Sequence, residues 1–416
     1  MLVLFPSDPF DTWKVDADWA EEARIAQECG HQVAYIHHES LVNDDDPGAA
    51  VKKIPDFDEP TRALYRGWML TSDQYRQLYE KLQACRVDLV TTPEQYKNTH
   101  ELPGWYGALA GATPDSRWFP ATDVMSGEGR ELDPVVLDAA RQMAPCIIKD
   151  YVKSRKHEWG EACFIPDADS AAAVISNFIE RQGDSLQGGL VLRDFVPLKS
   201  LGKHPKSGMP MSEEYRFFWL NGHVACLSEY WPEEMYETEE IEIPEPEGGW
   251  EEGMGRTITV PKSIENLPSF EELTEFGRGI DSPFFTMDLA MTEDEEWIVM
   301  EIGDGQVSGF PQMPTDAQKF YPGLEPLLNH RHAPAPPHRD TSRPQALTRV
   351  QMDPMTCAVP GCDHTDHGGG MFMHPRCHVG TPTWCSYGNG VVTISCAECD
   401  QVVARIAVDP GKPVQH

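Results

Sequence analysis

The N-terminal part of the chain alternates apolar runs with segments of helical periodicity. Apolar runs at 2–5, 31–37, 63–70 and 88–92 are separated by helical patterns at 18–29 and 72–84. Strands that alternate with helices predict an α/β unit with a largely parallel sheet. Asp16 or Asp18 and Ser72 stand where helix N-caps are expected, and Gly30 stands where the first helix would end.

A second group of apolar runs follows a segment rich in Gly, Pro and aromatic residues between 93 and 134. The runs cover 144–152, 160–165, 188–198, 214–220, 223–231, 284–291 and 295–303, with helical patterns at 133–143 and 169–181. Asn221 and Gly222 stand between two of these runs and are a strong signal for a two-residue hairpin turn. We expect an α/β domain over 1–132 and an α+β core over 133–328.

The charge of the chain restricts its partners. With 34 basic and 67 acidic residues the net charge is −33, which disfavours a general nucleic-acid binder because phosphates require an excess of Lys and Arg. There is no signal-peptide pattern and no run of about eighteen apolar residues, so we expect a cytoplasmic protein without membrane contact. Residues 233–252 contain ten Glu and no basic residue, and we expect a solvated acidic loop rather than a docking surface.

The C-terminal part is rich in Cys and His. A Pro-rich stretch at 330–344 predicts a linker over 329–352, followed by a small module over 353–410. Cys396 and Cys399 are spaced as Zn²⁺ ligands, and the site would be closed by His374 with Cys377, or by Cys377 with His378.

A second tetrahedral Zn²⁺ site is an open alternative to a solvated loop. Its candidate ligands are Cys357, Cys362, His364 and His367. Cys385 lies in an apolar stretch and is expected to be packed. We expect any zinc to be structural rather than catalytic, and to stabilise a zinc-ribbon-like β module.

A cluster of cations follows the apolar run that ends at Lys149. Lys149, Lys153, Arg155 and Lys156 lie within eight residues of each other. Cations at a strand end can neutralise a polyphosphate, because Lys offers a mobile charge and Arg a planar fork. Ordinary surface residues on a hairpin loop are the alternative explanation.

Carboxylates interrupt two neighbouring apolar runs. Asp288 lies in FFTMDLAM, and Glu301 and Asp304 lie in IVMEIGDGQ. A hairpin would bring these carboxylates together, and buried carboxylates require a cation or an ionic partner. Mg²⁺ is the natural cation, since one or two carboxylates and substrate phosphates hold it. A structural salt bridge from Glu301 to Arg216 is the alternative.

The order of several segments resembles the ATP-grasp superfamily. These segments are the run ending IIK, then VLRDFVP, EYRFFWLNG, MDLA and WIVMEIGDG. SDPFD, YRGWML and PEQYKNTHELPGWY further resemble a subgroup named for an arginine and two lysines. The resemblance covers about residues 1–325 and implies a pre-ATP-grasp domain over 1–132 and an ATP-grasp core of two α+β subdomains over 133–328.

The resemblance implies how the chain would hold the phosphates of ATP. Lys149 would contact the α- and β-phosphates, and Lys97 would match an earlier phosphate-contacting lysine. Arg216 would face the γ-phosphate, and with Lys149 and Lys153 it completes the candidate catalytic cations. The glycine-rich loop of the family is replaced by DYVKSRKHEWGE, in which only Gly160 could act as a hinge.

The resemblance also implies a hinge and a metal site. The backbone of the hinge would read the adenine edge; it comprises Arg193, Asp194, Phe195 and Val196. Arg193 stands where the family commonly has an acidic residue. Asp288 and Glu301 match the Mg²⁺ ligands, and Asp304 stands near where the family more often has Asn.

The function implied is ATP- and Mg²⁺-dependent ligation of a carboxylate to an amine or another nucleophile through an acyl phosphate. The substrates would be small molecules, peptides or protein side chains, and Arg66 is a candidate for holding a substrate carboxylate. The main alternative is a non-catalytic, regulatory nucleotide-binding protein whose zinc module recruits a protein partner. A lesser alternative is nucleic-acid end modification, which the basic residues of the linker support and the net charge opposes.

Overall fold

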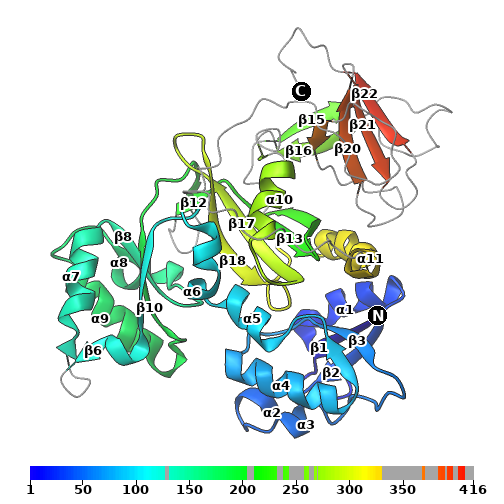
Figure 1. Cartoon of the computed structure of the whole chain (residues 1–416), viewed down its shortest axis with the longest axis horizontal. Coiled ribbons are helices and arrows are strands. Elements are labelled where there is room, and N and C mark those ends of the chain that lie inside the picture. Colours follow the sequence, from blue (N-terminus) through cyan, green and yellow to red (C-terminus); the bar gives the residue numbers. More distant parts are fainter. Residues whose placement is uncertain are drawn as a thin grey trace.

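The computed structural model describes residues 1–126, 131–203, 210–231, 238–242, 257–261, 267–268 and 270–329, and strands at 368–370, 383–388, 391–396 and 402–407. Three four-stranded sheets with helices packed on them make up most of the part before residue 330 (Figure 1). Among the described residues, no helix is both long enough and apolar enough to cross a membrane.

The N-terminal sheet is parallel, as the alternation of strands and helices predicts. Its order is β2-β1-β3-β4, with β1 at Leu2–Pro6, β2 at Gln32–Ile36, β3 at Thr61–Tyr65 and β4 at Val87–Leu89. The helices of this part are η1 (Ala17–Trp19), α1 (Ala20–Glu28), α2 (His38–Val42), α3 (Pro47–Ala50), α4 (Ser72–Ala84), α5 (Pro93–His100), α6 (Leu102–Trp105) and η2 (Tyr106–Leu109).

Helix caps in this part differ in one detail from the sequence prediction. Asp16 caps η1, as expected, and Gly30 ends the first helix with φ +86°. The N-cap of α4 is Thr71 rather than Ser72, because the Thr71 side chain accepts from the backbone N–H of Gln74 and the Gln74 side chain accepts from that of Thr71.

The second sheet is antiparallel, in the order β5-β10-β8-β9. It contains β5 (Ser116–Pro120), β8 (Cys146–Asp150), β9 (Phe164–Ile165) and β10 (Gly189–Asp194). The elements around it are η3 (Ala121–Asp123), β6 (Met125–Ser126), β7 (Glu131–Leu132), α7 (Pro134–Met143), η4 (Lys156–Glu158), α8 (Trp159–Ala162), α9 (Ala171–Gln182) and η5 (Gly183–Ser185). Of the strand expected at 160–165, the first half belongs to the short helix α8 and only Phe164 and Ile165 form a strand, β9.

The central sheet is antiparallel, in the order β14-β13-β17-β18. Its strands are β13 (Glu214–Leu220), β14 (His223–Glu229), β17 (Phe284–Met291) and β18 (Trp297–Asp304). The predicted turn between β13 and β14 is confirmed, since Asn221 and Gly222 have φ of 49° and 80°. Every residue of β17 is buried, so its one carboxylate, Asp288, requires a partner.

The remaining elements complete the described part. They are β11 (Ser200–Lys203), β12 (Pro210–Ser212), β15 (Thr238–Glu242), β16 (Thr257–Pro261), α10 (Phe270–Arg278), α11 (Thr315–Asn329), β19 (Gly368–Gly370), β20 (Thr383–Gly388), β21 (Val391–Cys396) and β22 (Val402–Ala407). One strand of the acidic segment, β15, pairs antiparallel with β16, which follows the segment. The side chains of all eight predicted zinc ligands, and those of the alternative His378 and of Cys385, lie outside the described residues.

An apolar core joins the N-terminal sheet to the central sheet. Its members include Val3, Phe5, Leu64, Phe218, Phe284, Phe320 and Leu324. In the middle of this core lies Arg66, which is fully buried at the end of β3. Arg66 donates from Nε to Glu22 at 2.7 Å and from a terminal nitrogen to the Ser308 carbonyl at 2.9 Å, and it also donates to the Gly305 carbonyl.

The guanidinium of Arg66 is thus occupied by the protein. Glu22, on α1, also accepts from the hydroxyl of Tyr321 on α11 at 2.7 Å. A buried charge is tolerated because it is both paired and hydrogen-bonded. The structure therefore gives Arg66, a sequence candidate for substrate binding, the role of joining α1, α11 and the segment after β18.

Replacing one partner of this buried pair should cost much stability. In Glu22→Gln the Arg66 charge would lose its ionic partner, and we expect the free energy of unfolding to fall by about 3 kcal/mol. Glu21→Gln is the matched control, since Glu21 lies on the same helix and pairs with Arg24 at an exposed site, where such pairs contribute less than about 1 kcal/mol. Calorimetric unfolding measures both; equal effects would contradict the prediction.

Candidate functional site

Three strands of the central sheet place charged side chains in one row. In the strand register Arg216 of β13 stands opposite Asp288 of β17, and Asp288 stands opposite Glu301 of β18. Side chains opposite each other across strands lie on the same face of the sheet. Arg216 forms two hydrogen bonds with Asp288, of 2.8 and 2.7 Å, and donates to the Gly309 carbonyl at 3.2 Å.

Lys149 reaches this row from the second sheet. It lies on β8, is 8% exposed, and its Nζ donates to Oε1 of Glu301 at 2.9 Å. Burial alone would raise the pKa of Glu301, but the charges of Lys149, Lys156 and Arg216 outweigh it and lower the pKa to about 2. Glu301 is therefore ionised at neutral pH. The row alternates in sign from Arg216 through Asp288 and Glu301 to Lys149.

Lys156 adds a further positive charge above the row. The phenol of Tyr230 and the carboxylates of Glu214, Glu301 and Asp288 raise its pKa. Glu214 lies two residues before Arg216 on β13, so it shares the face of the row. Burial raises the pKa of Glu214, whereas Lys156 acts to lower it. Lys149 and Lys156 of the predicted cation cluster thus lie close to Asp288 and Glu301 of the predicted carboxylates.

The loop that carries Lys153 and Lys156 is held by hydrogen bonds and ion pairs. Asp150 accepts from the backbone N–H groups of Val152 and Lys153 and from the side chain of Gln182. The sequence candidate Gly160 lies inside helix α8. The loop between β8 and β9 is therefore anchored at its start by Asp150 rather than by glycines.

Ion pairs tie the same loop to helix α9. Arg155 and Arg181 both bond to Glu158, and Arg181 also bonds to Glu161. Hydrogen bonds from Arg155 and then Arg181 lower the pKa of Glu158. A terminal nitrogen of Arg155 donates to the carbonyl of Arg181 at 3.0 Å. This assigns Arg155 of the predicted cation cluster to the structure of the loop.

His100 is a site residue that the sequence analysis missed. It ends α5, is 6% exposed and stacks on Tyr96 with ring centroids 4.8 Å apart. Burial, and then the charge of Lys153, lower its pKa to about 4, with Lys149 acting in the same direction. Its Nε2 has no hydrogen-bond partner among the described residues. A neutral imidazole with an unused nitrogen therefore lies beside the lysines of the site.

Lys97 lies one turn before His100 but does not join the row. Its side chain is 55% exposed, and its Nζ lies 3.9 Å from Glu101. The helical spacing of Lys97 and His100 was the available signal for His100, because residues three apart on a helix share a face.

The predicted hinge joins two sheets. Arg193 at the end of β10 donates to Thr113 Oγ1 at 2.7 Å and to the Met300 carbonyl at 2.8 Å. Burial lowers the pKa of Arg193 to about 10. The N–H groups of Asp194 and Phe195 donate to the carbonyls of Asp115 and Pro145, and Val196 follows directly. Two of the backbone donors expected to read adenine thus have partners within the chain.

Aromatic rings lie beside this hinge. The ring of Phe195 is 4.9 Å from that of Phe164, and Phe164 stacks on Trp159 at 5.3 Å. All three residues are half-buried. Planar apolar surfaces of this kind can pack against a planar ligand.

Asp304 lies apart from the row. Its partner in the register is Phe285, and it is fully buried against α5. Its carboxylate accepts from Thr99 Oγ1 at 3.2 Å and from the backbone and side chain of Gln306 at 3.0 and 3.2 Å. Burial raises its pKa to about 7, although these hydrogen bonds act to lower it.

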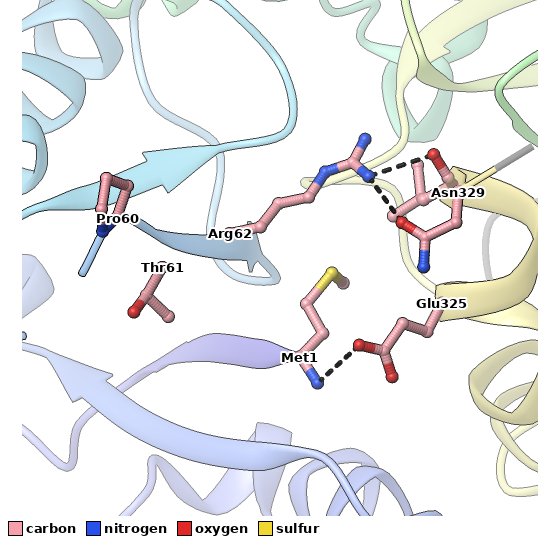
Figure 2. A pocket seen from close by; sticks show the side chains of 7 residues that line it. Met1, Pro60, Thr61, Arg62, Glu325 and Asn329 are labelled. Atoms are coloured by element: carbon pink, nitrogen blue, oxygen red, sulfur yellow. Dashed lines mark hydrogen bonds and ion pairs between the residues drawn. The ribbon is translucent and has the colours of Figure 1, made fainter. Parts of the chain in front are cut away.

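A cavity of about 320 Å³ lies elsewhere, at the N-terminal edge of the parallel sheet (Figure 2). Its lining includes Met1 and Thr61, at the starts of β1 and β3, and Arg62 and Glu325. Arg62 donates to the Leu328 carbonyl at 3.0 Å. Ligands of parallel sheets bind beyond the carboxyl ends of the strands, and none of the charged row lines this cavity.

The charged row offers two carboxylates, Asp288 and Glu301, as donors for a metal ion. Within the described ranges, no three His, Cys, Asp or Glu side chains converge as a metal site. Asp288 and Glu301 are ligands of the type that Mg²⁺ takes when substrate phosphates supply the rest. The residues of the row therefore fit Mg²⁺ with a phosphate ligand, and do not fit a metal cage made by protein alone.

A family of known domains matches the part of the chain that holds the charged row. Residues 139–324 match an ATP-grasp domain, that of family 3 in the clade named for an arginine and two lysines. The match covers β8 to α11, and so includes the whole charged row. It supports the ATP-grasp superfamily, and this clade within it, for this part of the chain. No curated protein matches the sequence.

Solved structures show weaker likeness to the chain. The RimK domain protein ATP-grasp from Sphaerobacter thermophilus DSM 20745 is 12% identical, covers 74% of this chain and 92% of its own, and has a TM-score of 0.43. D-cycloserine synthetase DcsG is 11% identical, with 73% and 92% covered and a TM-score of 0.42. D-alanyl-alanine synthetase A from Vibrio cholerae O1 biovar eltor str. N16961 is 11% identical, with 79% and 93% covered and a TM-score of 0.41.

The environment of Asp304 predicts a pH-dependent stability difference. The ordinary pKa of an Asp carboxyl, which applies to the unfolded chain, is 3.8, and the pKa of Asp304 in the folded chain is about 7. An acid with a raised folded pKa stabilises the fold when protonated, so this contribution is lost as pH rises from about 4 to about 7. Asp304→Asn cannot ionise, and its Tm should therefore rise relative to wild type across that range.

The control for this measurement is Asp138→Asn, at a side chain that is 65% exposed on α7. A plot of its Tm against pH should run parallel to that of the wild type. The quantity to compare is the change of Tm with pH. The amide of Asn has a different set of donors and acceptors, so the substitution can also shift Tm by a similar amount at every pH. A constant offset between Asp304→Asn and wild type would contradict the prediction.

Proposed function

We propose that the protein is an ATP- and Mg²⁺-dependent ligase that joins a carboxylate to an amine. The observation that carries this proposal is the alternating row of Arg216, Asp288, Glu301 and Lys149 inside the part that matches an ATP-grasp domain. ATP-grasp domains carry out such ligations, and the row supplies both charge types that the chemistry requires.

The ion pairs of the row could exchange partners when nucleotide binds. Lys149 pairs with Glu301, and Arg216 pairs with Asp288. With ATP present, the two cations would turn to the phosphates, and the two carboxylates would hold Mg²⁺. Mg²⁺ would neutralise phosphate charge and orient the γ-phosphate. The exchange keeps every buried charge compensated in both states.

Other residues would complete the nucleotide site. Lys153 and Lys156 extend the positive charge along the loop after β8, and side chains there would replace the backbone amides of a glycine-rich loop. His100 Nε2 could donate to a phosphate oxygen. The rings of Phe195, Phe164 and Trp159 lie beside the hinge and offer packing surface for the adenine.

The proposed chemistry has two steps. A carboxylate oxygen of one substrate attacks the γ-phosphorus, and the bond from that phosphorus to the β–γ bridging oxygen breaks, so that ADP leaves. The amine nitrogen of the second substrate then attacks the acyl carbon, the bond to the phosphate oxygen breaks, and the amine loses a proton. The protein's part is positioning and compensation of charge, and no nucleophilic side chain is needed.

Two other functions have less support. A non-catalytic nucleotide-binding protein would use Asp288 and Glu301 in the same way to hold Mg²⁺, so substrate-dependent turnover is what separates it from a ligase. The partner-recruiting zinc module of that alternative rests on ligands outside the described residues, and so does a structural zinc site. Nucleic-acid end modification is opposed by the net charge of −33.

Nucleotide binding can be tested through thermal stability. At ATP and Mg²⁺ concentrations of 100 times the dissociation constant, the wild type should gain about 2.7 kcal/mol. Lys149→Met keeps an unbranched side chain but removes the cation, and we expect it to lose most of this gain. The control is Lys81→Ala, at an exposed residue in the last turn of α4. A wild type without a gain, or an equal gain in Lys149→Met, would exclude the proposed site.

Turnover tests the reaction. We expect release of ADP that requires both a carboxylate and an amine, and Glu301→Gln should lower kcat by at least about 100-fold because charge compensation at the phosphates is lost. Glu293→Gln, exposed in the turn between β17 and β18, should keep the wild-type rate. ATP binding without any substrate-dependent ADP release would favour the regulatory alternative.

A further inference from the structure

Large apolar side chains are exposed at one edge of the N-terminal sheet. Phe10 is 97% exposed, Trp13 72%, Met69 42% and Trp68 38%. These four residues are the aromatic edge. They follow the carboxyl ends of β1 and β3, where parallel sheets bind ligands. The two loops leave the same end of the sheet, because β1 and β3 are parallel neighbours. Exposed apolar groups that share a surface mark interaction sites more often than scattered single residues do.

The first loop of the aromatic edge is held by its own hydrogen bonds. The Asp8 carboxylate accepts from the backbone N–H groups of Phe10 and Asp11, at 2.8 and 2.9 Å. The N–H of Asp8 donates to the Lys14 carbonyl, and that of Lys14 to the Asp11 carbonyl, both at 2.9 Å. Phe10 and Trp13 therefore project from an ordered turn rather than from a loose loop.

The second loop is also fixed. The Trp68 ring packs edge-on to Trp19 at 5.5 Å, and its Nε1 donates to Asp16 at 3.4 Å. The Tyr65 hydroxyl donates to the Trp68 carbonyl at 2.8 Å. A Cβ on Gly67 would lie 2.4 Å from that hydroxyl, so the loop requires glycine there. Aromatic rings held in place lose little entropy on binding, which is typical of interface hot spots.

The aromatic edge is connected to the charged row through the segment after β18. The N–H of Gly67 donates to the Gln306 carbonyl at 3.1 Å, and Arg66 donates to the carbonyls of Gly305 and Ser308. The next residue, Gly309, accepts from Arg216. A molecule seated on the aromatic edge would thus lie one loop away from the proposed γ-phosphate site.

The charges at the aromatic edge favour a cation. Four carboxylates, Asp8, Asp11, Asp16 and Asp18, lie on the first loop and on η1. Two ammonium groups oppose them, that of Lys14, which pairs with Asp11 at 2.8 Å, and that of Lys53. The ammonium of Lys53 lies 3.6 Å from the centroid of the Trp13 ring. This contact demonstrates that a lysine can sit on a ring of the aromatic edge, and indole is the best side chain for such cation–π contacts.

We propose that the aromatic edge docks a cationic polypeptide that supplies the amine for the ligation. The lysines or arginines of the polypeptide would pair with the carboxylates that follow β1, and its apolar side chains would pack on Phe10 and Trp13. The assignment of the amine rests on the proposed ligase function, whereas docking does not require ATP.

A binding experiment without ATP tests the docking. The probe is a short fluorescein-labelled peptide of lysine, phenylalanine, glycine and serine, measured by fluorescence anisotropy with the full chain. We expect it to bind at least about tenfold more tightly than a matched peptide with glutamate for lysine, or one with serine for phenylalanine. Phe10→Ser and Trp13→Ser should each weaken binding about tenfold or more.

The matched control is Trp118→Ser, because Trp118 is 37% exposed on β5 in the second sheet. It should bind the peptide as the wild type does. Equal binding of the lysine and glutamate peptides, or no effect of Phe10→Ser and Trp13→Ser, would overturn the proposal. So would a wild-type dimer in sedimentation that Phe10→Ser dissociates, since the aromatic edge would then bind a second copy.

The two proposals fail separately. Loss of peptide docking leaves the stability gain with ATP in place, and loss of the ATP gain leaves the anisotropy signal in place. If both signals hold, adding ATP and a carboxylate should release ADP in the presence of the peptide. Replacing lysine by arginine and acetylating the α-amino group keeps the positive charge of the peptide's side chains but removes its reactive amines, and ADP release should then stop; continued release would contradict the assignment of the amine.

Discussion

The position of the N-terminal sheet depends on a single buried guanidinium. Arg66 is fully buried, and its hydrogen bonds with Glu22, Gly305 and Ser308 leave it compensated in a medium of low dielectric constant. Because its partners come from α1 and from the segment after β18, these parts cannot separate without exposing an unpaired charge. The same contacts set where the loop that carries Trp68 begins, because Arg66 is the first residue after β3.

The charged row illustrates why the site requires opposite charges side by side. Lys149, Asp288 and Glu301 lie in the interior or near it, where an isolated ion costs several kcal/mol. Pairing compensates that cost without fixing which partner each ion has. The charges of three nearby cations lower the pKa of Glu301 to about 2. Glu301 therefore stays ionised over the whole physiological range, which suits binding of a polyanion with a divalent cation.

Much of the fold followed from patterns of apolar residues, because strand and helix periodicities are local properties. Helix α4 and strand β17 have the bounds that the sequence predicts, and the Asn221-Gly222 turn forms as expected. The prediction of a strand at 160–165 was wrong for the first half of this run, where Glu161 and the nearby Glu158 bond to Arg181 of a later helix. Strand β5 was not predicted, since SRWFP lies among turn residues and pairs only with the distant β10.

The site was predictable where a charge interrupts an apolar run, as at Lys149, Arg216, Asp288 and Glu301. The register of the strands aligns the last three, and Lys149 reaches Glu301 from the second sheet. Asp304 stands three residues after Glu301, and an odd spacing in a strand turns a side chain to the opposite face, where Thr99 binds it. The partners of Arg66 and the surroundings of His100 come from segments far apart in sequence, so no local pattern could reveal them.

The ion pairs of Arg155, Arg181 and Glu158 have a consequence for how a ligand would enter. A covering loop that is tied to α9 travels with that helix, so access would come from rotation of the whole β8–β10 unit as a rigid body. The axis would lie near Arg193, whose bonds to Thr113 and Met300 link that unit to β18. The frequency of opening would then be set by a hinge, on the microsecond to millisecond timescale of domain motion, rather than by the faster motion of a free loop.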